Sequence, residues 1–274
     1  MPAKSKSTPS RTPITALRLA EMKSRGEKIV ALTSYDSSFA ALCDRADIDI
    51  VLVGDSLGMV VQGRASTLPV SLDEMVYHTA AVSRGLNRAL LLADLPFMSY
   101  RDADWALRSS ARLIAEGNAA MVKLEGAGYA VDVIATLAGH DIPVCAHLGL
   151  TPQSVHKLGG YRVQGKSRSA ADRLTTDAEA VAQAGADLLV LECVPASLAK
   201  RITAQLSIPV IGIGAGADCD GQVLVLYDML GITPGKRPRF SKDFLVGRGS
   251  IEAALRAYAD AVRNGKFPAA EHTF

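Results

Sequence analysis

Carboxylates stand at the ends of two apolar runs in this sequence of 274 residues. Asp94 closes the run ALLLADLP (89–96), and Asp55 closes the run DIVLVGD (49–55). Apolar runs of this kind are typical of strands that are covered on both faces. An unpaired charge buried there is expensive, so such a group usually has a partner or a shifted pKa. Two acids in matching positions are therefore candidates for a shared site.

Charged and polar side chains also lie at the ends of three later runs, namely Lys123 and Glu125 in MVKLEG, His147 in VCAHLG and Glu192 in LVLEC. Lys123 and Glu125 are alternate residues of one strand, so both side chains face the same side of it. If the strands form a parallel barrel, all of these strand ends meet at one mouth. The polar residues are therefore expected to converge there.

The residue types favour Mg²⁺ chemistry. Hard oxygen ligands without a cysteine or histidine cluster suit Mg²⁺ better than Zn²⁺. Asp55 and Asp94 can share one ion if their strands are neighbours about 4.8 Å apart. A metal held in this way can polarise a carbonyl group and stabilise an enolate. A nearby carboxylate can then remove the proton α to that carbonyl.

Glu192 and Lys123 supply the remaining parts of such a reaction. Glu192 lies in an apolar segment, where desolvation should raise its pKa and make it a better base. Lys123 can neutralise a substrate carboxylate or an enolate oxygen. The residues alone indicate Mg²⁺-assisted enolisation of a small keto acid, followed by carbon–carbon bond formation.

Each of these residues also has a structural interpretation. Asp55 and Asp94 could cap the helices that follow them or pair with arginines. Lys123 and Glu125 could pair with other charges, because ion pairs alone often perturb such groups. A histidine such as His147 is more often a hydrogen-bonded structural residue than a catalyst or ligand. For two acids on adjacent strands, with Glu125 close by, the ion site is the better interpretation.

Other polar residues carry weaker signals. Ser56 could cap a turn, and Tyr35, at the end of the first apolar run, is more often a packing residue than a site residue. The acids Asp44, Asp47 and Asp49 are expected to lie on the solvated surface.

Short β-branched apolar runs alternate with longer amphipathic stretches from Ile14 onward. The predicted strands are 28–35, 49–55, 89–96, 120–126, 142–149, 186–193, 208–216 and, more weakly, 221–231. The predicted helices include 14–26, 71–86, 102–117, 195–206 and 250–265. This alternation predicts parallel strands with short crossovers. Eight units in about 250 residues favour a barrel over a doubly wound sheet, and no GxGxxG follows the first strand. We therefore predict a TIM (β/α)8 barrel with an additional N-terminal helix.

The first residues, MPAKSKSTPSR, contain basic side chains and no acid. We expect residues 1–12 to be a disordered tail and residues 13–274 to form a single (β/α)8 barrel domain. A basic arm that binds nucleic acid is a weaker alternative, because the net charge of the chain is only +2.

The sequence also lacks signals for export and for a membrane span. The basic segment has no apolar h-region, and no apolar run approaches the roughly 18 residues of a membrane span. Four cysteines lie far apart without a CxxC pair and are expected to be reduced thiols, namely Cys43, Cys145, Cys193 and Cys219. We expect a cytoplasmic protein that binds neither nucleic acid nor membranes.

Two of the predicted connections are long. Residues 57–70 follow the second run and residues 150–170 follow the fifth. Both follow strand ends at the expected mouth, where long loops often act as lids. A disordered insertion is the alternative for 150–170, which is rich in glycine and basic residues.

Long ordered segments of the chain resemble the ketopantoate hydroxymethyltransferase family. The segments are TSYDSSFA, VLVGDSLGMVVQG, STLPVSLDEMVYHTAAV, LLLADLPFMSY, MVKLEG, VCAHLGLTPQSV, LLVLECVP, AKRIT and IPVIGIGAG. They run from about residue 28 to residue 216, with weaker likeness to the ending EHTF. The resemblance implies a barrel of the phosphoenolpyruvate/pyruvate group. It also implies transfer of a hydroxymethyl group from 5,10-methylenetetrahydrofolate to 3-methyl-2-oxobutanoate, giving 2-dehydropantoate on the route to pantothenate and coenzyme A.

The resemblance also implies roles for individual residues. Asp55 and Asp94 would bind Mg²⁺ and the keto acid, and Glu125 would belong to the metal site. Ser56 and Lys123 would bind substrate, Glu192 would accept the proton, and Tyr35 and His147 would line the pocket. The family implies a cytoplasmic homo-oligomer, typically a homodecamer.

Two rival functions remain. The nearest is another Mg²⁺-dependent aldolase or lyase that acts on a pyruvate-like keto acid, and dependence on the folate donor separates it from the transferase. The second is a non-catalytic binding protein that kept the pocket, which the polar residues at so many strand ends argue against.

Overall fold

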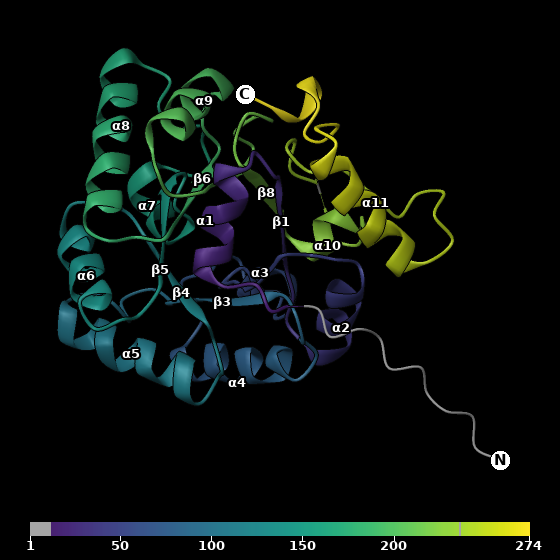
Figure 1. The fold of residues 1–274 in the computed structure, drawn as a ribbon, viewed down its shortest axis with the longest axis horizontal. Coiled ribbons are helices and arrows are strands. Elements are labelled where there is room, and N and C mark those ends of the chain that lie inside the picture. The colour runs from purple at the N-terminus through teal and green to yellow at the C-terminus, as the bar shows by residue number, and fades with distance from the viewer. Residues whose placement is uncertain (1–11, 236) are drawn as a thin grey trace.

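Eight parallel strands close into a barrel in chain order, and β8 pairs back onto β1 (Figure 1). The computed structural model describes residues 12–235 and 237–274. The strands are β1 (Ile29–Thr33), β2 (Ile50–Val53), β3 (Leu90–Asp94), β4 (Met121–Glu125), β5 (Val144–Gly149), β6 (Leu188–Glu192), β7 (Val210–Ile213) and β8 (Gly221–Leu224). Each lies within the apolar run that predicted it, so the (β/α)8 barrel is confirmed.

Helices follow every strand except β7, which leads directly into β8, and they surround the barrel (Figure 1). The helices are α1 (Ala16–Ser24), α2 (Ser37–Arg45), α3 (Leu57–Val60), α4 (Leu72–Ser83), α5 (Ala103–Ala115), α6 (Tyr129–Ala138), α7 (Val155–Leu158), α8 (Arg168–Gln183), α9 (Ala196–Gln205), α10 (Leu226–Met229) and α11 (Ile251–Arg263). Two 3₁₀ turns are η1 (Pro152–Ser154) and η2 (Ala270–His272). A capping box formed by Ser71 and Glu74 opens α4.

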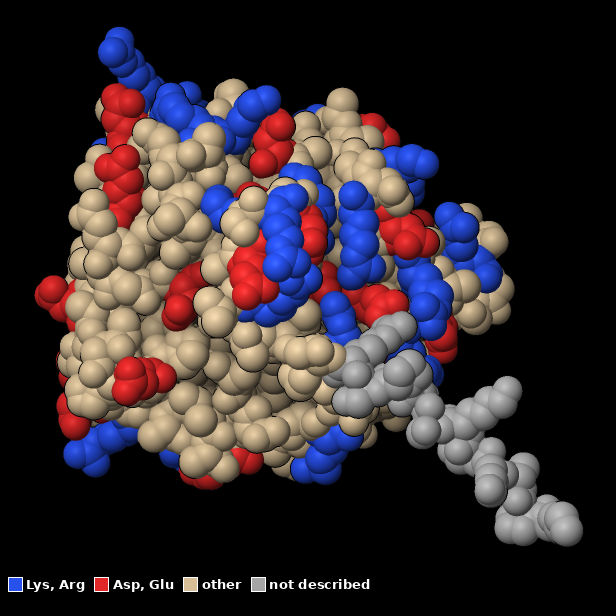
Figure 2. Space-filling view, in the orientation of Figure 1, with Lys and Arg blue, Asp and Glu red and all other residues tan. Residues whose placement is uncertain are grey.

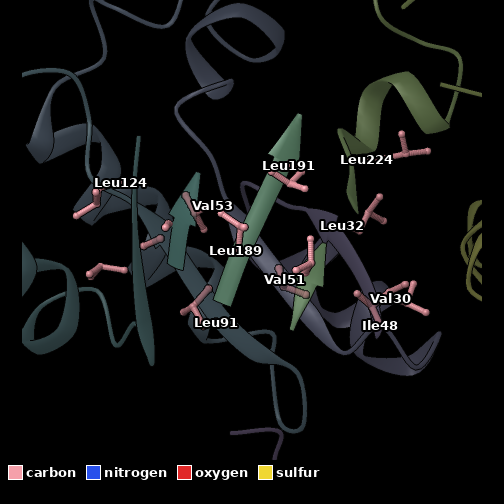
Figure 3. Packing of buried hydrophobic residues seen from close by; sticks show 14 of the residues in the cluster. Val30, Leu32, Ile48, Val51, Val53, Leu91, Leu124, Leu189, Leu191 and Leu224 are labelled. Carbon is pink, nitrogen blue, oxygen red and sulfur yellow. The ribbon is translucent and has the colours of Figure 1, made fainter. Parts of the chain in front are cut away.

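Alternate residues of each strand face opposite sides of the barrel wall. The inner side chains, such as Ile50 and Leu52 of β2, form one buried cluster. The outer side chains, such as Val51 and Val53, pack under the helices in a second cluster, part of which Figure 3 shows. The interior is therefore filled by side chains, and an open site can form only at an end of the barrel.

Helix α1 closes the amino end of the barrel. Its buried residues Leu19 and Met22 belong to the same cluster as the inward strand residues. Lys23 Nζ lies 2.7 Å from Asp220, just before β8, and the Ile14 N–H donates to the Arg88 carbonyl before β3. Figure 1 accordingly shows α1 in front of the strands. The additional N-terminal helix is thereby confirmed, and the carboxyl end is left as the place for a site.

The interpretation of Asp49 as a solvated acid is wrong. Its side chain is 1% exposed and pairs with Arg88 Nη2 at 2.6 Å and Arg263 Nη2 at 3.1 Å. The Val30 N–H also donates to it at 3.0 Å. This cluster could not be predicted from the sequence, because Arg263 lies on α11, at the far end of the chain.

The connection from 150 to 170 is structured rather than a disordered insertion. It contains η1 and α7, and Ser167 caps α8 by accepting from the Ala170 N–H. The expected disorder of the tail falls on residues 1–11, which lie outside the described part of the chain.

Two other expectations concern membranes and thiols. All four cysteines are buried and free. Within 12–235 and 237–274, no helix has the length and apolar character needed to cross a membrane.

Candidate functional site

The polar residues singled out in the sequence meet at the carboxyl end of the barrel. The inward series of β3 and β6 continues into a charged residue, since Asp94 follows Leu92 and Glu192 follows Val190. Lys123 and Glu125 similarly extend the inward series of β4, and His147 extends that of β5. The strand register pairs neighbours directly, Asp94 with Lys123 and Glu125 with His147. Adjacent strands therefore form an arc of polar side chains from β2 to β6.

Asp94 is held between β2 and β4. Its Oδ1 lies 2.8 Å from Lys123 Nζ, and its Oδ2 accepts from the Asp55 N–H at 3.0 Å. Burial raises the pKa of Asp94, although Lys123 acts in the opposite direction. The Lys123 pKa is raised despite burial, because the carboxylates of Asp94, Glu125 and Asp55 favour its charged form. The pair is therefore a buried ion pair in which the lysine stays protonated.

Asp55 has a different environment. It lies just beyond β2, where the chain leaves the strand, and its Oδ2 accepts from Gln153 Nε2 at 2.8 Å. Burial raises its pKa well above the ordinary aspartate value, and the charges of Asp94 and Glu125 raise it further. No cation in the described residues forms an ion pair with it. Asp55 is therefore a buried acid short of positive charge.

Gly54 leaves room for this turn. A Cβ at that position would lie 2.8 Å from Ser56 Oγ and 3.5 Å from Asp94 Oδ2. Ser56 Oγ in turn lies 2.9 Å from the hydroxyl of Tyr35, which is buried at the end of β1. The two hydroxyls therefore lie together beside the turn that carries Asp55.

Glu125, His147 and Glu192 form the second half of the arc. His147 Nδ1 lies 3.3 Å from Glu125 Oε1, and its Nε2 lies 3.3 Å from Glu192 Oε2. Burial and Lys123 oppose a charge on the imidazole, but the neighbouring carboxylates of Glu125 and Glu192 outweigh them and raise its pKa to about 9. The pKa of Glu125 is lowered despite burial, chiefly by His147. The His147 imidazole thus links two acids.

The backbone fixes Glu192 at the end of β6. Gly149, its register partner, has no room for a Cβ, which would lie 2.3 Å from the Glu192 carbonyl oxygen. Cys193 follows with φ of 48°, a left-handed conformation that is uncommon for residues other than glycine. The Glu192 side chain remains 14% exposed, more than the other members of the arc. Glu192 is thus buried enough to be held and open enough to meet a ligand.

Two members of the cluster were missed from the sequence. Gln153, in η1, donates to Asp55 through its side chain and to Glu125 Oε2 through its backbone N–H at 2.9 Å. The Tyr100 hydroxyl donates to Gln153 Oε1 at 2.6 Å. Their signals were their place in two of the segments that carry the family resemblance and in the connections that follow β5 and β3, where a barrel builds its site.

The donor chemistry of the cluster fits a divalent cation. The cluster contains three buried carboxylates, Asp55, Asp94 and Glu125. Asp94 pairs with Lys123 and Glu125 pairs with His147, whereas Asp55 pairs with neither. Among residues 12–235 and 237–274, no three His, Cys, Asp or Glu side chains form a ready ligand set. Mg²⁺ needs only one or two carboxylates and completes its octahedron with water and substrate. Asp55 and Asp94, bridged by one backbone hydrogen bond, meet that requirement.

Exposed apolar side chains lie on the connections around this mouth. The Tyr161 hydroxyl, after β5, lies 3.5 Å from Met59 Sδ, after β2. Phe97 and Met98 are exposed after β3, and Tyr129 is exposed after β4 and stacks on Tyr100. The mouth therefore has a charged floor and an apolar rim.

The fold and the polar mouth define the chain as a (β/α)8-barrel protein, and solved structures agree. Phosphoenolpyruvate phosphomutase from Streptomyces platensis subsp. rosaceus is similar, with a TM-score of 0.60 and 15% identity over 79% of this chain and 83% of that chain. A phosphonopyruvate hydrolase solved with oxalate and Mg²⁺ has a TM-score of 0.59 and 12% identity over 94% and 93%. At these identities the likeness shows the fold alone.

Sequence similarity defines the family more narrowly. The 3-methyl-2-oxobutanoate hydroxymethyltransferase of Alkalilimnicola ehrlichii is 60% identical over 97% of this chain and 96% of its own length. That of Thiobacillus denitrificans is 59% identical over 96% of this chain and 100% of its own length. The model of the ketopantoate hydroxymethyltransferase family matches residues 13–270. The chain belongs to the ketopantoate hydroxymethyltransferase family.

Proposed function

We propose that the chain transfers a hydroxymethyl group from 5,10-methylenetetrahydrofolate to 3-methyl-2-oxobutanoate, in pantothenate and coenzyme A biosynthesis. The products are 2-dehydropantoate and tetrahydrofolate. The observation that carries the proposal is the arc of Asp55, Asp94, Lys123, Glu125 and Glu192 at one barrel mouth. Near-full-length similarity to relatives named for this reaction supports it.

Asp55 and Asp94 are the proposed Mg²⁺ ligands, with Glu125 completing the metal site directly or through water. When bound, Mg²⁺ supplies a Lewis acid that polarises the keto group and stabilises negative charge on its oxygen. The close approach of the Asp55 backbone to Asp94 Oδ2 supports a shared ion, as does the lack of a cationic partner for Asp55.

Lys123 and Ser56 are proposed to bind the keto acid together with the two aspartates. The ammonium group of Lys123 is buried beside Asp94 and offers positive charge to the substrate carboxylate or enolate oxygen. Ser56 offers a hydroxyl that Tyr35 orients. A small α-keto acid, with oxygens on adjacent carbons, matches this set of donors.

Glu192 is the proposed base that removes the proton from C3 of the keto acid. It lies across the mouth from the aspartates and keeps part of its side chain open. His147 contacts both Glu192 and Glu125, so it orients the base. A positioned general base contributes about 10²–10⁴-fold to such a proton transfer.

The carbon–carbon bond forms when the C3 carbanion of the enolate adds to the one-carbon unit of the folate. The C3–H bond breaks, a C3–CH₂ bond forms, and water supplies the oxygen of the new hydroxymethyl group. Both C–N bonds of the folate methylene carbon break, and the two nitrogens keep the electron pairs and take up one proton from C3 and one from water. The apolar rim formed by Met59, Tyr161, Phe97 and Tyr129 is the proposed surface for the pterin and its aromatic tail.

We also propose that the protein is a cytoplasmic homo-oligomer, as the family resemblance implies.

The test is hydroxymethyl transfer followed by NMR. The protein, Mg²⁺ and unlabelled keto acid are mixed with tetrahydrofolate carrying a ¹³C-labelled methylene group. The proposal predicts a ¹³C-hydroxymethyl signal in 2-dehydropantoate that needs both Mg²⁺ and the folate. Keto acid turnover that is independent of folate would instead favour an aldolase or lyase, and no turnover would favour a binding protein.

A further inference from the structure

Gln153 has a partner for every polar atom of its side chain. Its Nε2 donates to Asp55 Oδ2 at 2.8 Å and to the Leu95 carbonyl at 3.0 Å, and its Oε1 accepts from the Tyr100 hydroxyl at 2.6 Å. Its backbone N–H donates to Glu125 Oε2 at 2.9 Å. Both amide protons and the amide oxygen are used, so a reversed amide would lose all three side-chain bonds.

Tyr100 fixes the orientation of this amide. Its hydroxyl accepts from the Glu125 N–H at 3.4 Å while it donates to Gln153 Oε1. The hydrogen bonds therefore run in a ring through Glu125, Tyr100 and Gln153, and all three residues are buried. Because a hydroxyl donates only one proton, the ring sets which end of the amide faces Asp55.

The charges of the cluster explain why an amide suits this position. Asp94 already has Lys123, and Glu125 has His147. A further cation beside Asp55 would compete with a divalent metal ion for the same carboxylate. A neutral amide orients Asp55 Oδ2 without adding positive charge, and no hydrogen bond from the described residues occupies Asp55 Oδ1.

Gln153 also connects the cluster to the rim. It lies in η1, at the start of the connection that carries Tyr161, whose hydroxyl reaches Met59. The conformation of that connection and the orientation of Asp55 therefore depend on the same residue.

We propose that Gln153 is a positioning residue that holds Asp55 and Glu125 in the orientation that binds the divalent cation. The proposal rests on the metal site of the proposed function. Residues that orient metal ligands typically change metal affinity about 10–100-fold when they are replaced.

The experiment measures Mn²⁺ binding to the metal-free protein by electron paramagnetic resonance, without substrate. Gln153→Leu should weaken Mn²⁺ binding about tenfold or more, because it removes the side-chain donor and keeps a similar volume. Tyr100→Phe should weaken it less, because the amide remains but is no longer oriented. In turnover, both variants should need more Mg²⁺ for half-maximal rate, with much of the rate recovered at saturating Mg²⁺.

Gln222→Leu is the matched control. Gln222 is also buried, and its Nε2 donates to the Gly216 carbonyl at 2.9 Å, away from the carboxylates. It should lower stability and leave the Mn²⁺ affinity unchanged. If Gln153→Leu does not fold, Tyr100→Phe decides the question.

The outcomes separate the two proposals. If the parent protein binds Mn²⁺ and the Gln153 or Tyr100 variants bind it equally well, the role of Gln153 alone is overturned. A parent that binds no divalent cation overturns both the metal site and this role. Weakened binding in the Gln222 control as well as in Gln153→Leu would mean general destabilisation, and would also overturn the proposal.

Discussion

Strand β2 carries a buried aspartate beyond each of its ends, and the two differ in how their charge is compensated. Asp49, at the amino end, is 1% exposed and pairs with Arg88 and Arg263. Asp55, at the carboxyl end, is also buried, but its donor is the neutral amide of Gln153, and repulsion by Asp94 and Glu125 opposes the attraction of Lys123. Full compensation marks a structural ion cluster, whereas a deficit of positive charge marks a place for a ligand.

The two ends of the barrel repeat this contrast. The amino end is closed by α1, whose Arg18, Lys23 and Arg25 pair with nearby acids. Figure 2 shows this face, with basic and acidic side chains intermingled over its centre. The carboxyl end gathers buried charges at the ends of adjacent strands. Stability and chemistry are therefore expected to respond to different residues.

Glu192→Gln should have the largest effect on chemistry. The amide has the size of the carboxylate but cannot take the C3 proton, so exchange of C3 deuterium should fall about 10²–10⁴-fold. Binding of keto acid and Mg²⁺, followed by calorimetry, should persist. Undiminished exchange would remove Glu192 from the role of base.

Asp49→Asn should have the largest effect on stability. It leaves Arg88 and Arg263 facing an amide, and the free energy of unfolding should fall by about 2–3 kcal/mol. This is less than for a fully buried pair, because the arginine side chains are 18% and 33% exposed. Urea denaturation measures the loss, and the folded variant should retain the exchange rate of the parent. Loss of exchange in the folded variant would mean that Asp49, at the amino end, also affects the chemistry at the carboxyl end.

Asp55→Asn should show the opposite behaviour. Without added metal, the free energy of unfolding at neutral pH should stay the same or rise by about 1 kcal/mol, because a poorly compensated buried charge is removed. Mg²⁺ at about 100 times its Kd should stabilise the parent by about 2.7 kcal/mol and should leave this variant unchanged. A variant that is strongly destabilised without metal would mean that Asp55 serves structure, as Asp49 does.

The smallest effect is expected from an exposed pair on α5. Arg108 Nε lies 2.8 Å from Asp104 at a solvent-exposed position. Arg108→Ala should leave both the melting temperature and the C3 exchange rate unchanged within error, since such pairs contribute little. A clear change in the melting temperature or in the exchange rate would show that surface charge also contributes to stability or to chemistry.

Much of the fold could be predicted because the strands of a parallel barrel are continuous apolar runs in the sequence. All eight runs contain a strand, and the acids that close them lie where the strand ends meet. The position of Gln153 could not be predicted, since it depends on the conformation of a long connection and on Tyr100 from another one. The burial of Asp49 could not be predicted, because its partners, Arg88 and Arg263, come close to it only when the barrel has closed.

The most direct test of the account is Mg²⁺-dependent exchange at C3 of the keto acid. The protein is incubated with C3-deuterated 3-methyl-2-oxobutanoate, with and without Mg²⁺, and deuterium loss is followed by NMR. The proposed chemistry predicts exchange in the parent only with Mg²⁺, no exchange in Asp55→Asn, exchange slowed about 10²–10⁴-fold in Glu192→Gln, and parental exchange in Asp49→Asn. Absence of exchange in the parent under both conditions, or metal-independent exchange, would contradict it.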